Sequence, residues 1–139
     1  MELHKPLTII IADDDQDDIE LLHFSFNQND KFEIVGCFDS GTEVLEEIIT
    51  KGKIPDILII DMYMPILTGT EIVNKLVESG VAPNMNSFII STIINTTEQQ
   101  NYIENASIHF VKKPVTLVEI NDFPGIVLEC LNHVNNTKV

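Results

Sequence analysis

Short apolar runs of strand length recur along the chain at fairly even intervals, with segments of helical periodicity between them. The runs cover residues 7–12, 32–38, 57–60, 88–90 and 108–111. β-branched residues dominate the first, third and fourth runs, which is typical of strands buried on both faces. Strands that alternate with helices of about 10–15 residues indicate βαβ units. The pattern therefore predicts a doubly wound α/β fold, with a five-stranded parallel sheet and helices on both faces.

Apolar residues at helical spacing predict five helices between and after these strands, around residues 19–26, 44–49, 72–77, 96–106 and 123–134. The fourth of these has a weak apolar face, so we expect it to be among the more mobile elements. We expect the last helix to begin near Asp122, because Pro124 would then lie in the first turn, where a proline is tolerated.

The composition suits one acidic domain. The chain has 139 residues, 22 acidic and 8 basic, so its formal net charge is −14. This length predicts a single domain over residues 1–139 with no output domain. The charge disfavours nucleic acid and anionic membranes as partners, and favours a basic protein surface or a bound cation. The sequence shows no run of about 18 apolar residues and no signal peptide, so we expect a cytoplasmic protein.

Cysteines and histidines give no sign of a metal site. Cys37 and Cys130 are too few for a disulfide scaffold, and we expect two buried thiols in a reduced compartment. The four histidines lack metal-binding spacing and are expected to be surface or partly buried residues.

Polar side chains follow four of the five predicted strands. They are Asp13, Asp14 and Asp15 after the first strand, Asp61 after the third, Ser91 and Thr92 after the fourth, and Lys112 and Lys113 after the fifth. Ligands of a doubly wound sheet bind at the carboxyl ends of its strands. We therefore expect these side chains to gather at one edge.

Such a set of carboxylates favours a cation. Two carboxylates about 4 Å apart repel by roughly 4 kcal/mol at an effective dielectric constant of 20. Either one takes up a proton or a cation lies among them. Mg²⁺ (or Mn²⁺) prefers oxygen ligands and keeps several waters, so two or three carboxylates suit it. A carboxylate, a divalent ion, a hydroxyl and a lysine are the parts that phosphoryl transfer to an aspartate needs.

Each member of the set also has an ordinary structural explanation. Asp15, Asp17, Asp18 and Glu20 fit the first turn of a helix, where acidic residues favour the helix dipole. A serine at a strand end usually caps a turn, and a single lysine usually lies at the surface. The interpretation therefore rests on the combination.

The combination resembles the response-regulator receiver domain (CheY-like) of two-component signalling. The matching pieces are residues 9–15, residues 61–65 with Gly69, Ser91, and residues 113–114, and the stretch 39–45 is also similar. The resemblance covers about residues 7–134. It implies a flavodoxin-like (βα)5 fold.

The resemblance implies a role for each carboxylate of the site. Asp61 matches the phosphoacceptor, which attacks the phosphoryl group of a phosphohistidine. Asp14 matches a direct Mg²⁺ ligand, and Asp13 a ligand that acts largely through water. Asp61 and the backbone carbonyl of Tyr63 match the remaining protein ligands.

The same resemblance implies a conformational switch. Ser91 matches the hydroxyl that bonds the phosphoryl group, and Lys113 matches the lysine that pairs with its oxygens. Phe110 matches the aromatic switch residue, which fills space as Ser91 moves. The face formed by the fourth helix, fifth strand and fifth helix would then change shape. The bond before the proline is commonly cis in this family, so Lys113–Pro114 is a candidate.

Three residues bear on the rates of these steps. Thr92 stands where a very small residue is frequent in the family, and its bulk could slow access of the phosphodonor. Tyr63 and Ile93 flank the site where the family tunes phosphate lifetime. We hypothesise slow self-dephosphorylation.

The implied partners are a sensor histidine kinase or histidine phosphotransfer protein and an unknown protein effector, with a homodimer possible on phosphorylation. The protein would be a phosphoacceptor that assists its own phosphorylation and dephosphorylation, and not an enzyme with a separate substrate. The sequence leaves open a degenerate receiver that binds partners without phosphorylation.

Two other classes fit less well. A Mg²⁺-dependent phosphatase of the haloacid-dehalogenase type needs Asp-x-Asp, but Tyr63 stands two positions after Asp61. A calcium-binding EF-hand loop starting at Asp13 would need a glycine at position 18 and a glutamate at position 24, where the chain has Asp18 and Phe24.

Overall fold

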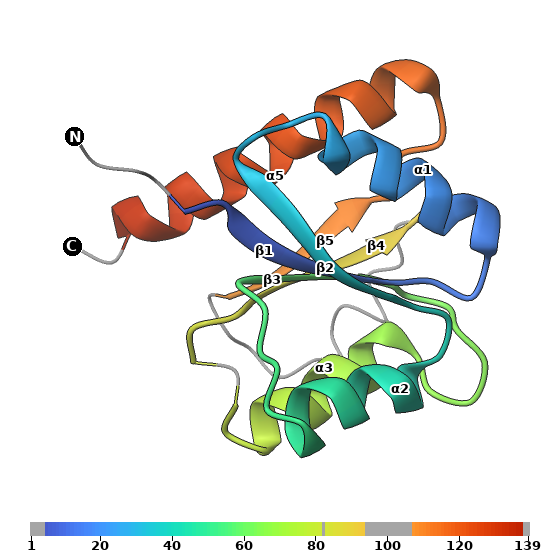
Figure 1. Cartoon of the computed structure of the whole chain (residues 1–139), viewed down its shortest axis with the longest axis vertical. Helices are drawn as coiled ribbons and strands as arrows, with labels where there is room; N and C mark the ends of the chain where they lie inside the picture. The colour runs from blue at the N-terminus through green and yellow to red at the C-terminus, as the bar shows by residue number, and fades with distance from the viewer. Residues whose placement is uncertain (1–4, 82, 94–106, 138–139) are drawn as a thin grey trace.

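The computed structural model describes residues 5–81, 83–93 and 107–137, and shows a sheet between two layers of helices (Figure 1). The strands are β1 (Leu7–Ala12), β2 (Phe32–Phe38), β3 (Ile57–Asp61), β4 (Asn86–Ser91) and β5 (Ile108–Lys112). They pair in parallel in the order β2-β1-β3-β4-β5. This arrangement confirms the predicted doubly wound, five-stranded sheet.

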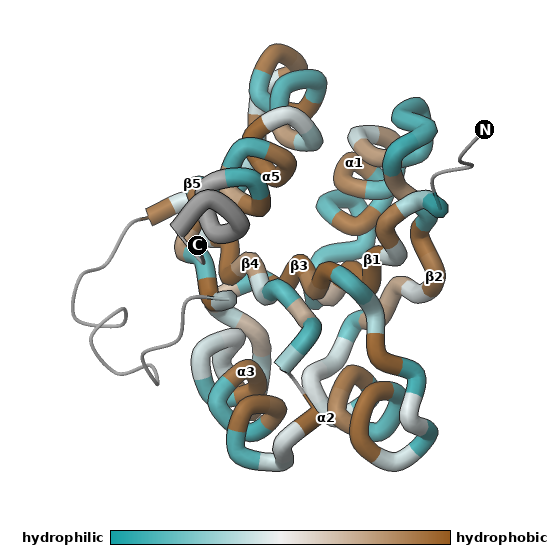
Figure 2. Tube along the Cα trace, turned by 90° about the vertical axis from the view of Figure 1, so that its left-hand side faces the viewer, coloured by the Kyte–Doolittle hydropathy of each residue, from teal (hydrophilic) through white to brown (hydrophobic). Residues whose placement is uncertain are grey.

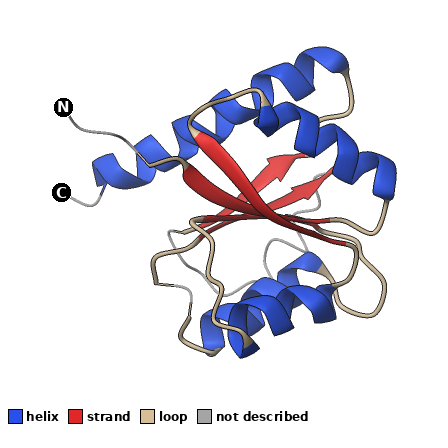
Figure 3. Cartoon of the chain, in the orientation of Figure 1, coloured by secondary structure: helices blue, strands red, loops and turns tan. Residues whose placement is uncertain are grey.

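Helices cover both faces of the sheet. In Figure 2, α1 (Gln16–Asn27) and α5 (Leu117–Thr137) lie on one side of the strands, with α2 (Gly41–Leu45) and α3 (Gly69–Glu78) on the other. Figure 3 shows the same layers by secondary structure. α2 continues directly into a π-helical turn, η1 (Glu46–Thr50). The predicted helix at 96–106 lies outside the described residues.

Successive side chains of the central strands point to opposite faces of the sheet and pack into two separate hydrophobic cores. Ile9 and Ile11 of β1 pack on the side of α1 and α5, with Phe26 and Phe123. Ile10 packs on the opposite side, in the core that α2 and α3 cover. β3 is buried along its whole length. Burial on both faces explains why these strands are continuous apolar runs in the sequence.

The prediction of two buried thiols was wrong. Cys37 is exposed and Cys130 is half-buried, and both are free. β2 is an edge strand with a neighbour on one side only, so its side chains are covered less than those of β1 or β3.

The last helix begins earlier than predicted. The Glu119 amide donates to the Thr116 hydroxyl (3.1 Å), and the Glu119 carboxylate accepts from the Thr116 amide (3.0 Å). This reciprocal pair is a capping box, and it starts α5 at Leu117. Pro124 therefore lies inside the helix, and not in its first turn.

Ser25 supplies the hydrogen bond that Pro124 cannot. A proline has no amide proton, so the carbonyl four residues earlier, that of Ile120, loses its helical partner. The buried Ser25 hydroxyl on α1 donates to this carbonyl over 2.6 Å. Ser25 and Ile120 are 95 residues apart, so local periodicity could not reveal the compensation.

No helix within the described ranges is long and apolar enough to cross a membrane.

Candidate functional site

β1 and β3 bring three carboxylates together at the carboxyl edge of the sheet. Asp13 follows β1 directly, Asp61 ends β3, and the two strands are paired neighbours. One oxygen each from Asp13, Asp14 and Asp61 lies within 4.8 Å of the others. Asp13 is fully buried, Asp61 is 7% exposed and Asp14 is open to solvent. The predicted gathering of these residues is therefore seen in the structure.

The pKa values of the two buried carboxyl groups, those of Asp13 and Asp61, are both raised. Burial and, next, the charge of Asp13 raise the pKa of Asp61 to about 6. Burial also raises the pKa of Asp13. A carboxylate that is buried and lies close to another negative charge binds its proton more tightly, so its pKa rises. An all-oxygen cluster with one solvent-exposed member fits Mg²⁺, which binds carboxylates while keeping several waters.

The ammonium of Lys113 lies among these carboxylates. Its Nζ donates hydrogen bonds to Asp61 Oδ1 (3.1 Å) and Asp18 Oδ2 (2.7 Å). Asp13 Oδ2 lies 2.7 Å away, as an ion pair without hydrogen-bond geometry. Burial alone would lower the pKa of Lys113, but the neighbouring carboxylates outweigh it and hold the pKa above its usual range. Lys113 therefore stays charged at neutral pH.

Asp18 is the site residue that the sequence reasoning missed. Asp15 behaves as predicted for a helix start, since its side chain accepts from the amides of Asp17 and Asp18. Asp18 does more, because its carboxylate reaches Lys113. The available signal was its position four residues before the buried Leu22, which places both on the same side of α1.

Ser91 lies at the same edge, with its hydroxyl held by the loop that follows β4. The hydroxyl donates to the Ile93 carbonyl over 2.6 Å and accepts from the Ile93 amide over 3.1 Å. Phe110 on β5 is half-buried against the core that α2 and α3 cover. The two predicted switch residues therefore lie on neighbouring strands. Ser91 ends β4, which pairs with β3, and Phe110 is on β5, which pairs with β4.

Tyr63 contacts the site through its backbone. Its amide donates to Asp61 Oδ2 over 3.2 Å, and its side chain is 47% exposed. The role of its carbonyl as a metal ligand stays a prediction. The Lys113–Pro114 bond is trans, unlike the cis form that the sequence suggested. The two isomers before proline differ by only about 0.5–1 kcal/mol, so sequence alone does not select one.

Gly69 packs directly against the backbone of Asp61. A Cβ atom on Gly69 would lie 2.6 Å from the Asp61 carbonyl oxygen and 3.2 Å from Met62 Cα. The Gly69 amide donates to the Met62 carbonyl over 2.8 Å. A capping box of Thr68 and Glu71 fixes the start of α3 at this point. The first turn of α3 therefore helps to set the position of Asp61.

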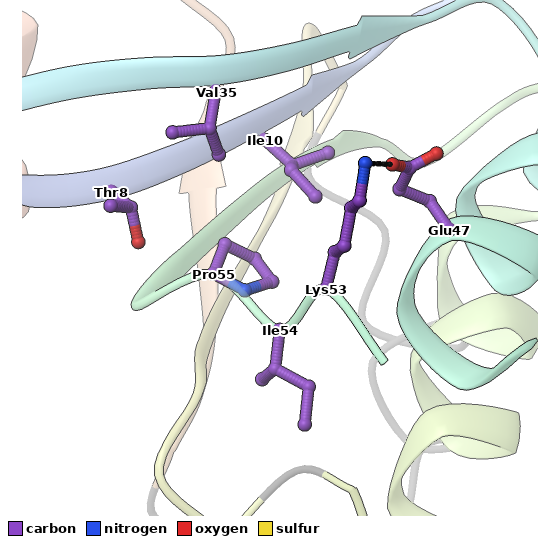
Figure 4. Close-up of a pocket in the computed structure, with 7 residues that line it drawn as sticks. All are labelled: Thr8, Ile10, Val35, Glu47, Lys53, Ile54 and Pro55. Atoms are coloured by element: carbon purple, nitrogen blue, oxygen red, sulfur yellow. Dashed lines mark ion pairs between the residues drawn. The ribbon is translucent and has the colours of Figure 1, made fainter. Parts of the chain in front are cut away.

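A cavity of about 300 Å³ lies beside β1, β2 and the segment that precedes β3 (Figure 4). It is lined by Thr8, Ile10, Val35, Glu47, Lys53, Ile54 and Pro55. Lys53 and Glu47 form an ion pair of 3.5 Å beside it. None of the predicted site residues lines this cavity.

Comparison with curated proteins gives related sequences that are longer than this chain. A protein-glutamate methylesterase/protein-glutamine glutaminase of Syntrophomonas wolfei is 27% identical over 108 residues, which are 76% of this chain and 29% of that protein. A similarly named protein of Myxococcus xanthus is 25% identical over 118 residues, 84% of this chain and 33% of the relative. The chain therefore spans only about a third of each relative's length.

Solved structures share the fold. The receiver domain of the NarL response regulator from Mycobacterium tuberculosis superposes with a TM-score of 0.72 at 23% identity, covering 91% of this chain and 97% of that one. The response regulator domain of Thermotoga maritima CheB gives a TM-score of 0.70 at 18% identity, with 94% and 97% covered. The family model for the response regulator receiver domain matches residues 9–123. Because this match covers most of the chain, the chain belongs to the response regulator receiver domain family.

Proposed function

We propose that this chain accepts a phosphoryl group from a phosphohistidine onto Asp61. The observation that carries the proposal is the buried Lys113 ammonium, which lies 3.1 Å from Asp61 Oδ1, while Asp61 itself clusters with Asp13 and Asp14. With a pKa of about 6, Asp61 is mostly ionised at neutral pH and is available as a nucleophile. The lysine supplies positive charge where phosphoryl oxygens would arrive.

The transfer step needs no oxidant or reductant, and only a proton besides the two reactants. An oxygen of Asp61 forms a bond to phosphorus while the phosphorus–nitrogen bond of the donor breaks. The electron pair of that bond leaves with the imidazole nitrogen, and a proton on the other ring nitrogen, or one taken from water, makes the departing imidazole neutral. Lys113 would hold the transferred phosphoryl oxygens through charge-assisted hydrogen bonds.

We propose that Mg²⁺ (or Mn²⁺) binds at Asp13, Asp14 and Asp61, with the Tyr63 carbonyl as a further ligand. The support is the all-oxygen cluster, with its three ligand atoms within 4.8 Å. When bound, the ion would neutralise the carboxylates and the incoming phosphoryl oxygens.

The signal would start at Ser91. To bond a phosphoryl oxygen, its hydroxyl must give up the 2.6 Å bond to the Ile93 carbonyl. This exchange couples the charge on Asp61 to the backbone of the loop after β4. Phe110, half-buried on the adjacent β5, would then repack and alter the face that includes β5 and α5.

A docking surface for the phosphodonor surrounds the site. Tyr63, Ile66, Ile93, Val115 and Leu117 are exposed apolar residues on loops or helix ends that follow β3, β4 and β5. Ile66 is 95% exposed at a φ of 73°, a strained value for a β-branched residue. These residues support a histidine kinase or phosphotransfer protein as the partner. Residues 1–139 would act as one receiver domain.

The test is phosphorylation with a small donor. Acetyl phosphate and Mg²⁺ should add one phosphoryl group to the intact protein, seen by mass spectrometry. Asp61→Asn should abolish the adduct, and so should omission of the metal ion. Asp30→Asn, the same chemical change at an exposed position on the α1–β2 connection, should leave it intact. No adduct, even with a phosphorylated phosphotransfer protein as donor, would instead favour a binding module that works without phosphorylation.

A further inference from the structure

Asp18 holds Lys113 from a helix that contributes nothing to the carboxylate cluster. Its Oδ2 accepts from Lys113 Nζ over 2.7 Å, across 95 residues of sequence. We infer that Asp18 is a positioning residue, which fixes the Lys113 ammonium beside Asp61 for phosphoryl transfer. The inference rests on the proposed function and adds to it a residue from α1.

The three carboxylates around Lys113 are not equivalent. Asp13 and Asp61 belong to the cluster suited to a divalent cation, and in the described part of the chain that cluster does not include Asp18. A cation shared by Asp13 and Asp61 would weaken their hold on Lys113. Asp18 would then be the carboxylate whose charge stays committed to the lysine.

The ammonium can keep this anchor during the reaction. Lys113 has three N–H donors, and one can point to Asp18 while the others serve Asp61 and an arriving phosphoryl oxygen. A lysine side chain has a long flexible stem, so one fixed partner narrows the positions that its charge can take. Correct placement of a charged group before reaction speeds the chemical step.

Asp18 is itself well fixed. It lies in the first turn of α1, where its backbone amide donates a hydrogen bond to the Asp15 side chain over 3.4 Å. The next residue, Ile19, is buried in the core. The Asp18 side chain is 30% exposed, so water partly screens its charge, but its carboxylate still forms the ion pair with Lys113.

Asp17 separates this role from a simple effect of negative charge. It occupies the same first helical turn and is exposed, and its amide is capped by the same Asp15 side chain. Replacing Asp17 with Asn removes the same formal charge and a similar helix-dipole interaction. A difference between the two variants therefore reports the contact with Lys113.

The experiment measures the phosphorylation rate at saturating Mg²⁺ and acetyl phosphate. Asp18→Asn should lower the rate about tenfold, as expected for loss of one charge-assisted hydrogen bond. Asp17→Asn should stay within about twofold of the parent, which is the range of a modest surface-charge effect. Asp18→Glu, which keeps the charge, should recover most of the rate. Far-UV circular dichroism and one cooperative urea transition confirm that each variant is folded.

A kinetic cycle shows whether Asp18 acts through Lys113. In a Lys113→Met background, the further change Asp18→Asn should have no effect on the residual rate. Equal rates for Asp18→Asn and Asp17→Asn would overturn the inference, and so would the same loss in both lysine backgrounds. If Asp18→Asn does not fold, a rate for Asp18→Glu as slow as that of Lys113→Met would also overturn it. Failure of the parent protein to become phosphorylated would instead contradict the proposed function.

Discussion

The place of Asp61 depends on a neighbour that carries no side chain. Gly69 begins α3, and the nearest atoms to a Cβ added there are all backbone atoms of Asp61 and Met62. Backbone atoms at the end of a fully buried strand have little room to move aside. The glycine therefore matters for the placement of the proposed nucleophile as well as for packing.

Gly69→Ala should displace Asp61 and slow phosphorylation. The 2.6 Å approach to the Asp61 carbonyl oxygen cannot be accepted without a backbone shift, and overpacking of this kind costs about 1–3 kcal/mol of stability. Gly125→Ala is the matched control, since an added Cβ there meets nothing within 4 Å. It should leave the rate unchanged and raise helix stability by up to about 1 kcal/mol. Urea unfolding and the acetyl phosphate assay would measure both effects, and parent-like behaviour of Gly69→Ala would contradict this account.

Sequence reasoning could find Asp13, Asp14, Asp61 and Lys113 because each follows a strand of a parallel sheet. Strand ends of such a sheet meet at one edge, so the chain order already implies their proximity. Asp18 belongs to a helix, and its contact depends on how α1 is rotated against the sheet. Its first-turn position also has a sufficient local explanation, which hid the second role.

α1 and α5 are joined by a polar contact inside an apolar layer. The Ser25 hydroxyl satisfies the Ile120 carbonyl that Pro124 leaves without a helical partner. The same layer contains edge-to-face contacts of Phe26 with Phe123, at a centroid distance of 5.7 Å. The proline is therefore tolerated inside α5 because a neighbouring helix completes its hydrogen bonding.

Ser25→Ala should destabilise the fold by about 1–3 kcal/mol, because it leaves a buried carbonyl without a donor. Ser79→Ala removes a similar hydroxyl-to-carbonyl bond, to Leu76, at an exposed position where water can replace it. That control should lose less than about 0.5 kcal/mol. In a Pro124→Ala background the restored amide can bond the Ile120 carbonyl, so Ser25→Ala should cost less. Equal costs in the two backgrounds, measured by urea unfolding, would show that the hydroxyl does not compensate for the proline.

The start of α5 should depend on the charge of Glu119. Hydrogen bonds from the backbone of Val115, then the Lys112 side chain and the backbone of Thr116, lower the pKa of Glu119 to about 2. A carboxyl group with a lowered folded-state pKa adds stability above its ordinary value of 4.5, and this stability is lost as the pH falls towards 2. Glu119→Gln should therefore be less stable than the parent at pH 7, with the gap closing towards pH 2. A pH-independent gap in urea unfolding would contradict the charge-based explanation.

The strands were predictable because burial on both faces leaves a continuous apolar run in the sequence. The start of α5 was not, because Pro124 has a strong local preference for a first turn. The capping box at Thr116 and Glu119 and the distant Ser25 hydroxyl together overrule that preference. Element boundaries that depend on such contacts need the three-dimensional arrangement.

In the molecule as a whole, the apolar cores that stabilise the fold and the charged groups of the site occupy different regions. Two apolar cores hold the sheet from both faces, and the charged groups of the site gather at its carboxyl edge. The formal net charge of −14 adds a long-range field that favours partners with basic surfaces. A rigid sheet with reactive loops at one edge suits a signal that begins as a local change of charge.

The most direct test of the central claim is to locate the phosphoryl group. Borohydride reduces an aspartyl phosphate to homoserine, and peptide mass spectrometry can then identify the modified position. After treatment with acetyl phosphate and Mg²⁺, we expect homoserine at position 61 and nowhere else among the acidic residues of the site. Homoserine at position 13, 14 or 18, with Asp61 unmodified, would contradict the assignment of Asp61 as the phosphoacceptor.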